Sequence, residues 1–266
     1  MGTARQLAVV TGASSGIGLA LAKEFAEHDF DLIICAEDAE LDTAGLVLSG
    51  TGRQVQMVRA DLANPRGVEE LVSRVAAAGR PVDALVVNAG VGVGGAFAGE
   101  DTSLAEQLNV VDLNVRSSVH LAKRLLPAMC ARGAGRVLFT SSIAAVLPGP
   151  FQATYNASKA FLLSFSEALR EELRDTGVTV TALMPGPTDT EFFARANLED
   201  TKLGASEGKD DPAEVAKQAF AAMMAGEHRV VAGSMSNKAQ VAAANVVPDP
   251  VLAAQHRRQS EPGSAE

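Results

Sequence analysis

The single tyrosine of the chain and a nearby lysine are the residues whose spacing most clearly suggests chemistry. Tyr155 and Lys159 lie four residues apart at the start of a stretch of helical length, and residues at this spacing share one helix face. A phenol ionises near pH ~10, so proton exchange at neutral pH requires a group that stabilises its anion, such as a nearby ammonium. The same pair also fits an ordinary helix face whose lysine reaches solvent. Other residues must therefore decide between these interpretations.

Two serines follow an apolar run upstream of the tyrosine. The run Val137–Phe139 has the composition of a buried strand, and Ser141 and Ser142 come shortly after it. Ligands of open α/β sheets bind at the carboxyl ends of the strands. One of these hydroxyls could therefore hold a substrate oxygen beside the phenol, while capping of the next turn is the alternative role. A Ser–His–Asp hydrolase is disfavoured because Ser142 lacks the nucleophile-elbow pattern.

A glycine-rich turn near the start of the chain has the properties of a phosphate-binding turn. Gly12 permits a tight bend, Gly16 lets the backbone approach a diphosphate, and Gly18 allows close packing of helix and sheet. The following helix would offer free N–H groups and a partial positive charge to the phosphates. The spacing G-x-x-x-G-x-G differs from the commoner fingerprint, and a purely structural turn is the alternative. The residues predicted to bind a cofactor here are Gly12, Ser14, Ser15, Gly16, Ile17 and Gly18.

The remaining pattern predicts the elements that position these residues. Short runs rich in Val, Ile and Leu, with little alternation, predict buried strands at 7–10, 32–35, 55–58, 84–87, 137–139, 178–183 and 229–232. Amphipathic stretches between them predict helices at about 16–28, 65–78, 101–131, 153–175 and 212–225. This alternation predicts the α/β class, as a single-domain Rossmann fold whose doubly wound, mostly parallel seven-stranded sheet has helices on both faces.

Composition restricts the possible partners of the protein. The formal net charge of −9 over 266 residues disfavours nucleic acid and anionic membranes as main partners. Two distant cysteines and the lack of a long apolar run indicate a reducing, cytoplasmic setting without a membrane anchor. No metal site is predicted, and the histidines are expected to be surface or helix residues at positions His28, His120, His228 and His256.

Taken together, these motifs resemble the short-chain dehydrogenase/reductase family, of the Tyr-x-x-x-Lys type. The resemblance covers roughly residues 6–235. It implies an NAD(P)-dependent oxidoreductase that moves hydride reversibly between a nicotinamide and a carbonyl or secondary alcohol substrate. The motifs that carry it are Thr11–Gly18, Asp61-Leu62, Asn88-Ala89-Gly90, Asn114, Ser142, Tyr155, Lys159 and Pro185-Gly186.

The resemblance also implies catalytic roles. Tyr155 corresponds to the general acid/base, and Lys159 to the lysine that lowers the phenol's pKa and holds the nicotinamide ribose. Ser142 precedes the tyrosine by 155 − 142 = 13 residues, as in the family, so it corresponds to the serine that positions the substrate oxygen. Capping is then the role left to Ser141. Asn114 resembles the asparagine whose helix distortion orders a water in the proton relay.

Cofactor contacts follow in the same way. The resemblance assigns Asp61 and Leu62 to the adenine, and Asn88, Ala89 and Gly90 to the ribose, together with Tyr155 and Lys159. The loop with Pro185, Gly186, Thr188 and Thr190 would clasp the nicotinamide and fix the pro-S hydride face. Strand two ends in Ala36-Glu37-Asp38 without either family signature for cofactor choice. Because these acids would repel a 2′-phosphate, we expect NAD with Glu37 as ribose acceptor, with NADP as the alternative.

The polar segment 187–211 is expected to be a substrate lid, with a surface insertion as the alternative. We expect residues 1–247 to form the catalytic domain and 248–266 a polar tail whose last ten residues fray. A homodimer or homotetramer is expected through the helices near 101–131 and 153–175. The alternatives are a dinucleotide sensor without turnover on the same fold and another Rossmann protein such as a methyltransferase. The substrate is a small molecule whose identity the sequence does not give.

Overall fold

A single parallel sheet forms the centre of the molecule in the computed structural model, which describes residues 5–244 and 246–265. The strand order is β3-β2-β1-β4-β5-β6-β7, and every neighbouring pair is parallel. The strands are β1 (Leu7–Thr11), β2 (Asp31–Ala36), β3 (Val55–Arg59), β4 (Ala84–Val87), β5 (Gly135–Thr140), β6 (Val178–Pro185) and β7 (Arg229–Ala232). The predicted fold class is therefore confirmed. Because the strand order reverses between β1 and β4, a crevice is expected at their carboxyl ends.

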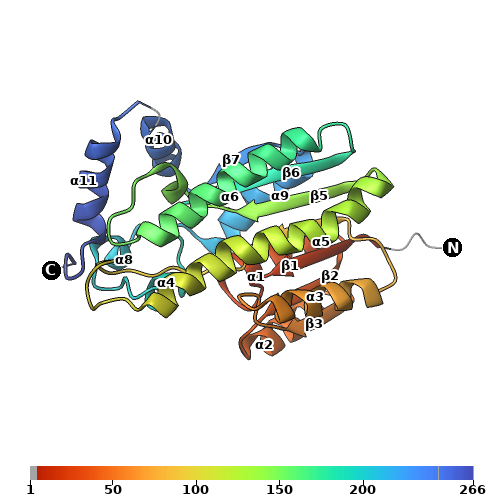
Figure 1. The fold of residues 1–266 in the computed structure, drawn as a ribbon. Helices are drawn as coiled ribbons and strands as arrows, with labels where there is room; N and C mark the ends of the chain where they lie inside the picture. Colours follow the sequence, from red (N-terminus) through yellow and green to blue (C-terminus); the bar gives the residue numbers. More distant parts are fainter. Residues whose placement is uncertain (1–4, 245, 266) are drawn as a thin grey trace.

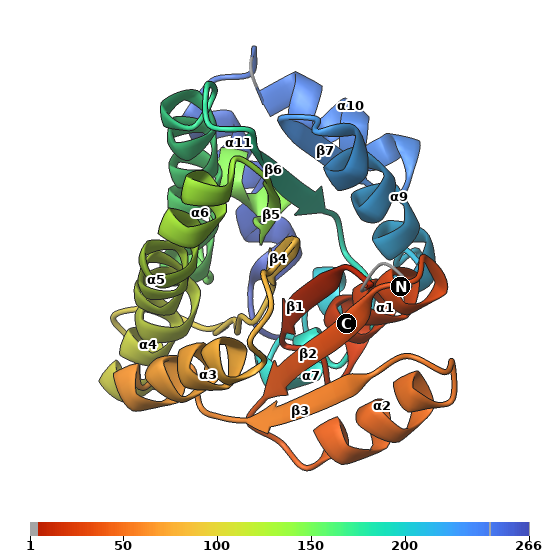
Figure 2. The same ribbon diagram turned by 90° about the vertical axis from the view of Figure 1, so that its right-hand side faces the viewer.

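Helices cover both faces of the sheet (Figures 1 and 2). One layer holds α3 (Pro65–Ala77), α5 (Ser117–Arg132) and α6 (Ala153–Glu172), and the other holds α1 (Gly16–Glu27), α2 (Glu40–Ser49) and α9 (Pro212–Ala225). Successive strand residues point to opposite faces. In β1, Val9 accordingly packs in the α3–α5–α6 core and Val10 in the α1–α2–α9 core. Burial on both faces explains why the strands read as unbroken apolar runs.

Two helical regions differ from the predictions. The helix expected over 101–131 is divided into α4 (Leu104–Val110), a π-helical turn η1 (Val111–Arg116) and α5. Helix α2 was not predicted, because Leu46 and Val47 on its outer side are exposed and blur the apolar periodicity. Gly45 lies where α2 packs on β3, since a Cβ there would be 2.1 Å from the Met57 sulfur.

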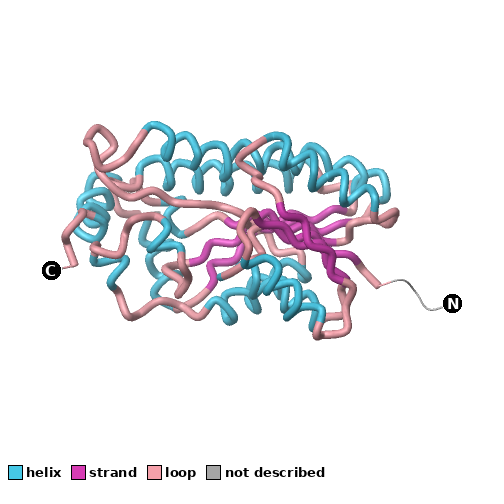
Figure 3. Tube along the Cα trace, turned by 90° about the horizontal axis from the view of Figure 1, so that it is seen from below, coloured by secondary structure: helices cyan, strands magenta, loops and turns pink. Residues whose placement is uncertain are grey.

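The carboxyl end of the sheet carries the elements of the predicted lid and tail. They are the 3₁₀ turn η2 (Ile143–Val146) and helices α7 (Phe192–Arg195), α8 (Lys202–Ala205), α10 (Met235–Ala244) and α11 (Asp249–Ser260). Figure 1 shows α8, α10 and α11 gathered at the end towards which β5 points, and Figure 3 shows the strands as one layer between the helices.

Helix α11 corrects the expectation of a frayed tail. Its buried residues are Leu252, His256 and Ser260, and the backbone of Ala265 donates to the Asp200 carbonyl at 2.9 Å. The composition gave no signal for this helix because its many polar residues make contacts that only the tertiary structure creates. Within the described residues, no helix combines the length and apolar character that a membrane span requires.

Candidate active site

A cavity of about 630 Å³ lies at the carboxyl ends of the strands. It is lined from one side by the glycine turn and the ends of β4, β5 and β6, and from the other by α7, α10 and α11. The structure brings together most of the predicted site residues here. Those that line the cavity are Gly12, Ser14, Ser15, Gly16, Ile17, Gly18, Glu37, Leu62, Asn88, Ala89, Gly90, Ser142, Tyr155, Lys159, Pro185, Gly186, Thr188 and Thr190.

The glycine turn has the backbone that its spacing predicted. Gly12 and Gly16 have φ of +65° and +53°, which glycine adopts without steric cost. A Cβ on Gly18 would lie 1.9 Å from the Gly12 carbonyl oxygen, so this position admits only glycine. Helix α1 starts directly after the turn and has no side-chain cap at Ser15. Its first N–H groups therefore face the cavity end without a competing side-chain acceptor.

Asn88 joins the ends of three strands beneath the cavity. Its Nδ2 donates to the Thr11 carbonyl of β1 at 3.1 Å, and its Oδ1 accepts from Thr140 Oγ1 of β5 at 3.1 Å. The backbone N–H of Asn88 also donates to Thr11 Oγ1 at 2.9 Å. Since buried hydrogen-bonded groups are costly to separate, this network fixes the floor of the crevice.

The two serines after β5 have distinct roles. Ser142 caps the turn η2, because its Oγ accepts from the Ala144 N–H at 3.1 Å, and it also hydrogen-bonds the Tyr155 phenol. Ser141 Oγ instead donates to the Lys159 carbonyl at 2.7 Å and ties β5 to α6. The expectation that Ser141 is the capping residue is therefore wrong. Cap geometry depends on backbone direction, which the residue types do not reveal.

Tyr155 and Lys159 lie together in the first two turns of α6. Lys159 Nζ is 5.6 Å from the centre of the phenol ring and donates to the Thr140 carbonyl at 2.9 Å. Burial raises the pKa of Tyr155 to about 12, against which the Ser142 hydrogen bond acts. Burial lowers the pKa of Lys159 to about 8. The expected lowering of the phenol's pKa is thus not present in the structure, because loss of solvent outweighs the stabilisation of the anion.

Asn114 lies behind the cavity rather than in it. It is fully buried in the π-helical turn η1. Its side chain exchanges two hydrogen bonds of 2.9 Å with the Val91 backbone, and its Nδ2 also donates to Ser158 Oγ at 2.9 Å. The π turn lets the side chain leave the helix towards the ends of β4 and α6. π turns often occur at functional sites.

Three acidic side chains near β2 and β3 have different positions. Asp61 is exposed and absent from the cavity lining, and its Oδ1 accepts from the Ala63 N–H at 2.8 Å. Glu37 lines the cavity but is exposed. Asp38 is half-buried, and its Oδ2 accepts from Ser14 Oγ at 2.9 Å. Its Oδ1 is buried and has no partner among the described residues, and a buried acceptor in this state is poised to receive a donor.

The segment 187–211, expected to be a lid, contacts Tyr155. Its two ends lie side by side, because Asp189 N donates to the Asp210 carbonyl at 2.9 Å and Asp210 N to the Pro187 carbonyl at 2.8 Å. Between these ends, the ring of Phe192 lies 5.1 Å from that of Tyr155, centre to centre. Phe193 packs in a small apolar cluster with Ala196 and Leu198 of the same segment.

Sequence reasoning missed the part of the cavity wall that α11 provides. His256, expected to be a surface or helix residue, is 7% exposed and lines the cavity with Leu252, Gln255 and Gln259. Burial lowers the pKa of His256. A stripe at positions i, i+3, i+4 and i+7 is a possible signal, but three of its four members are polar.

These observations test whether the cavity can hold a nicotinamide dinucleotide. Added Cβ atoms would fill the space beside the glycine turn, since one on Gly12 would lie 2.9 Å from Ala89 Cα. The N-terminus of α1 can hold a diphosphate, and the unpartnered oxygen of Asp38 can accept from a ribose hydroxyl. The residues therefore fit the cofactor.

Comparisons with known proteins agree with this geometry. A profile described as "short chain dehydrogenase" matches residues 6–201. A short chain dehydrogenase of Pseudocercospora fijiensis is 36% identical over 188 residues, which cover 70% of this chain and 61% of that relative's length. The chain belongs to the short-chain dehydrogenase family of NAD(P)-dependent oxidoreductases.

Two solved structures show what proteins of similar fold bind. A short chain dehydrogenase/reductase from Burkholderia phymatum in complex with NAD has a TM-score of 0.81 and 26% identity, covering 91% of this chain and 92% of its own. A short-chain dehydrogenase from Sphingobium yanoikuyae in complex with NADPH has a TM-score of 0.78 and 28% identity, covering 85% and 87%. Both forms of the cofactor therefore occur among the structural relatives.

Proposed function

We propose that this protein catalyses reversible hydride transfer between a nicotinamide dinucleotide and a small carbonyl or secondary alcohol substrate, with Tyr155 as general acid/base. The observation that carries this proposal is the convergence of Ser142, Tyr155 and Lys159 on one cavity whose other end is the glycine turn. The cofactor, when bound, supplies or accepts the hydride. The chain's own residues hold the substrate oxygen and move its proton.

The protonation states favour Tyr155 as the proton donor in reduction. With a pKa of about 12, the phenol keeps its proton at neutral pH, so it is ready to donate to a carbonyl oxygen held by the Ser142 hydroxyl. Lys159, with a pKa of about 8, carries its charge at neutral pH and can stabilise the phenolate that forms. Asn114 hydrogen-bonds the Val91 backbone. We propose that it positions the groups of the proton relay through these bonds.

We infer that NAD is the preferred cofactor and that the ribose acceptor is Asp38 together with Glu37. Asp38 is the better candidate for the ribose acceptor than Glu37 alone, because one of its carboxylate oxygens is buried and has no partner among the described residues. A 2′-phosphate would meet two carboxylates at this end of the cavity. The approach of Arg195 to Asp38 at 3.7 Å lessens this repulsion but does not reverse it. We propose that the other residues predicted to bind the cofactor contact it as expected, because they line the cavity. Asp61 is the exception, because it does not line the cavity.

The segment 187–211 is proposed to be the substrate lid of a catalytic domain that spans residues 1–247. The contact between Phe192 and Tyr155 supports this, because an aromatic ring over the phenol excludes water from the reaction. The anchoring of α8 to the end of the chain, where Lys202 N donates to Ser264 Oγ at 3.1 Å, indicates that residues after 247 help to position the lid.

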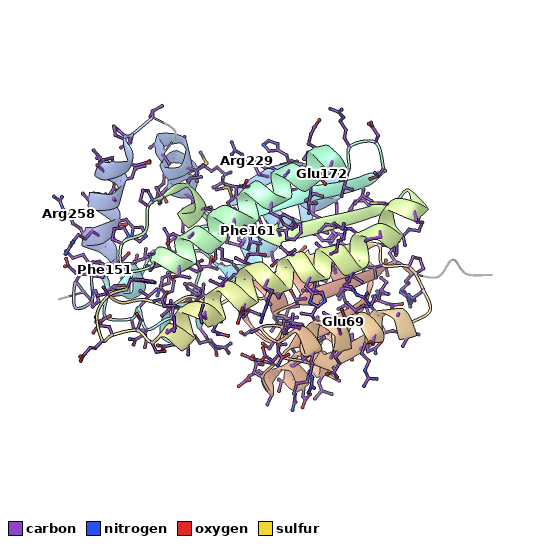
Figure 4. All side chains as sticks on the ribbon, in the orientation of Figure 1. Glu69, Phe151, Phe161, Glu172, Arg229 and Arg258 are labelled. Carbon is purple, nitrogen blue, oxygen red and sulfur yellow. The ribbon has the colours of Figure 1, made fainter. Side chains whose placement is uncertain are left out.

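A homodimer or homotetramer is proposed through the face formed by α4, η1, α5 and α6. Large apolar side chains remain exposed there, at Leu108, Val111, Val119 and Phe161. Figure 4 shows Phe161 on the outer face of α6, above α5. Burial of such a patch favours association. Sedimentation should give a multiple of the 27.5 kDa chain mass, and Phe161→Glu should shift it towards the monomer.

A cytoplasmic location is proposed because Cys35 and Cys130 are both free, as expected in a reducing compartment.

The variant Tyr155→Phe tests the proposed reaction. It removes the proton donor while keeping the ring, so turnover should fall by roughly 10²–10⁴-fold. NADH binding, measured by its fluorescence, should change less than about threefold, equivalent to less than about 0.7 kcal/mol. Retained turnover would refute the mechanism. NADH binding by the native protein without turnover of any carbonyl or alcohol would instead identify a dinucleotide sensor.

A further inference from the structure

The residues just before α6, the helix that carries Tyr155, make side-chain and backbone contacts with α11. Pro150, Phe151 and Gln152 are consecutive, and each contacts one turn of α11. The Pro150 carbonyl bonds the His256 imidazole, the Phe151 ring lies 5.3 Å from the Arg257 guanidinium, and Gln152 Nε2 donates to Ser260 Oγ at 3.2 Å. Figure 4 shows Phe151 near the lower end of α11 and Arg258 on the outer side of the same helix.

The partners of His256 favour one direction of hydrogen bonding from Pro150 to Gln152. A carbonyl only accepts, so the neutral imidazole of His256 gives its one N–H to Pro150. With that N–H on Nε2, Nδ1, which lies 3.1 Å from Ser260 Oγ, accepts from the serine hydroxyl. The serine oxygen in turn accepts from Gln152, which fixes the amide nitrogen of that residue towards α11. The carboxamide oxygen of Gln152 is left as an acceptor.

This oxygen belongs to a side chain at the cavity, close to the reacting groups. Gln152 is 3% exposed and lines the cavity. It occupies the N-cap position of α6, three residues before Tyr155, and its side chain makes no capping hydrogen bond. Residues at this spacing are neighbours, about 5–6 Å apart between Cβ atoms. A donor on the substrate one or two bonds away from the carbonyl could reach it. No cofactor contact is assigned to Gln152.

The surrounding wall selects for uncharged substrates. Leu252, Gln255 and Gln259 complete the face that α11 turns to the cavity, while Arg257 is occupied by Phe151 and Glu261. Within the described lining, the cations are Lys159, which the proposed mechanism uses, and Arg195, which pairs with Glu191 and Asp38. An anionic substrate would lack a free cation here.

We propose that Gln152 is a specificity residue that accepts a hydrogen bond from a hydroxyl next to the substrate carbonyl, and that Ser260 and His256 orient it for this. The substrate class is then uncharged hydroxy ketones and the corresponding diols. This inference rests on the proposed oxidoreductase function and adds the substrate class to it.

Three ketones of equal size test the proposal. In 1-hydroxybutan-2-one, a hydroxyl replaces one methyl of pentan-3-one, and in 2-oxobutanoate a carboxylate replaces one whole ethyl group. Calorimetry with protein saturated with oxidised NAD measures binding without reduction, and kcat/KM with NADH measures turnover. Native protein should prefer the hydroxy ketone over pentan-3-one by about tenfold in both measurements. It should bind 2-oxobutanoate most weakly.

Variants distinguish the loss of the proposed hydrogen bond to Gln152 from a general loss of substrate binding. Gln152→Met should abolish the preference, because it should weaken 1-hydroxybutan-2-one by about tenfold more than it changes pentan-3-one. Ser260→Ala should reduce the preference, and Ser260→Thr should restore it, because the hydroxyl rather than the volume orients Gln152. Arg258→Ala, on the exposed side of α11, is the matched control and should match the native protein.

Equal binding of the three ketones, preference for 2-oxobutanoate, or failure to bind the hydroxy ketone would each overturn the proposal. So would a preference that survives in Gln152→Met. Equal loss of both uncharged ketones in Ser260→Ala would reduce Ser260 to a structural role and contradict its orienting role. None of these outcomes depends on Tyr155→Phe, whose retained turnover would overturn the reaction itself.

Discussion

The two sides of the cavity are built by different means. On the chemistry side, the glycine turn and the ends of β4, β5 and β6 are held by backbone geometry and by hydrogen bonds between strand ends such as those of Asn88. On the substrate side, α11 is held by side chains that lie more than 100 residues away in the sequence, as Gln152 and Ser260 show, while the segment 187–211 is closed by backbone hydrogen bonds between its own ends. The difference is consistent with the proposals that the sheet ends position the reacting groups and that α11 contributes to substrate selection.

Gly18→Ala should break the chemistry side with the largest effect. A methyl group 1.9 Å from the Gly12 carbonyl must displace the turn, so stability should fall by about 1–3 kcal/mol. NADH affinity should fall about 100-fold, equivalent to about 2.7 kcal/mol. Gly52→Ala is the control, since its Cβ would have no neighbour within 4 Å. This control should keep NADH affinity even if its positive φ costs stability. Equal NADH affinity in both variants would contradict the role of the turn.

The buried lysine gives the chemistry side a pH limit. Since the pKa of Lys159 is about 8, the rate of carbonyl reduction should fall above pH 8, by up to about tenfold per pH unit. Stability should behave in the opposite way. Between pH 8 and 9 the unfolded chain binds more protons than the folded one because of Lys159, so the free energy of unfolding should rise with pH there. Above pH 9 the rise should end, because burial raises the pKa of Cys35 to about 12 and the folded chain then keeps a proton that the unfolded chain loses.

Parallel pH profiles of kcat/KM and of chemical denaturation check both signs. Lys217→Arg, at an exposed position, should leave both profiles unchanged. A reduction rate that stays constant up to pH 10 would show that the charge of Lys159 is not needed.

Asp38→Asn should sharpen the assignment of the cofactor. Loss of one carboxylate beside the ribose should reduce the preference for NADH over NADPH about tenfold, equivalent to about 1.4 kcal/mol. Dissociation constants of both dinucleotides measure this ratio. Asp42→Asn removes an exposed carboxylate that pairs with Arg59 and should leave the ratio unchanged. An unchanged ratio in Asp38→Asn would remove Asp38 from the ribose site.

His256 should give the substrate side a smaller pH effect. Burial lowers its pKa below 6.5, so below pH 6.5 the unfolded chain binds more protons and stability decreases as the pH falls. His256→Gln should flatten this part of the profile in chemical denaturation. A decrease of the same size in the variant would assign the acid sensitivity to other groups.

The sequence predicted the chemistry side because its signals are local. The residue type of Gly12, Gly16 and Gly18 already indicates a tight turn. The four-residue spacing of Tyr155 and Lys159 already indicates a shared helix face. The sequence did not reveal the pKa of Tyr155, because burial of the phenol arises only in the tertiary structure, where Phe192 of a later segment contacts its ring. The exposed position of Asp61 depends on the course of the loop after β3. Helix α11 escaped prediction because the partners of His256 and Ser260 lie more than 100 residues earlier.

Transfer of deuterium tests the central claim most directly. NADH that carries deuterium at the pro-S position of C4 should be oxidised with 1-hydroxybutan-2-one or another ketone substrate, and the product analysed by mass spectrometry and NMR. We expect the deuterium on the former carbonyl carbon and none left on the oxidised cofactor. A product without deuterium, or deuterium retained on the cofactor, would contradict direct hydride transfer in the proposed orientation.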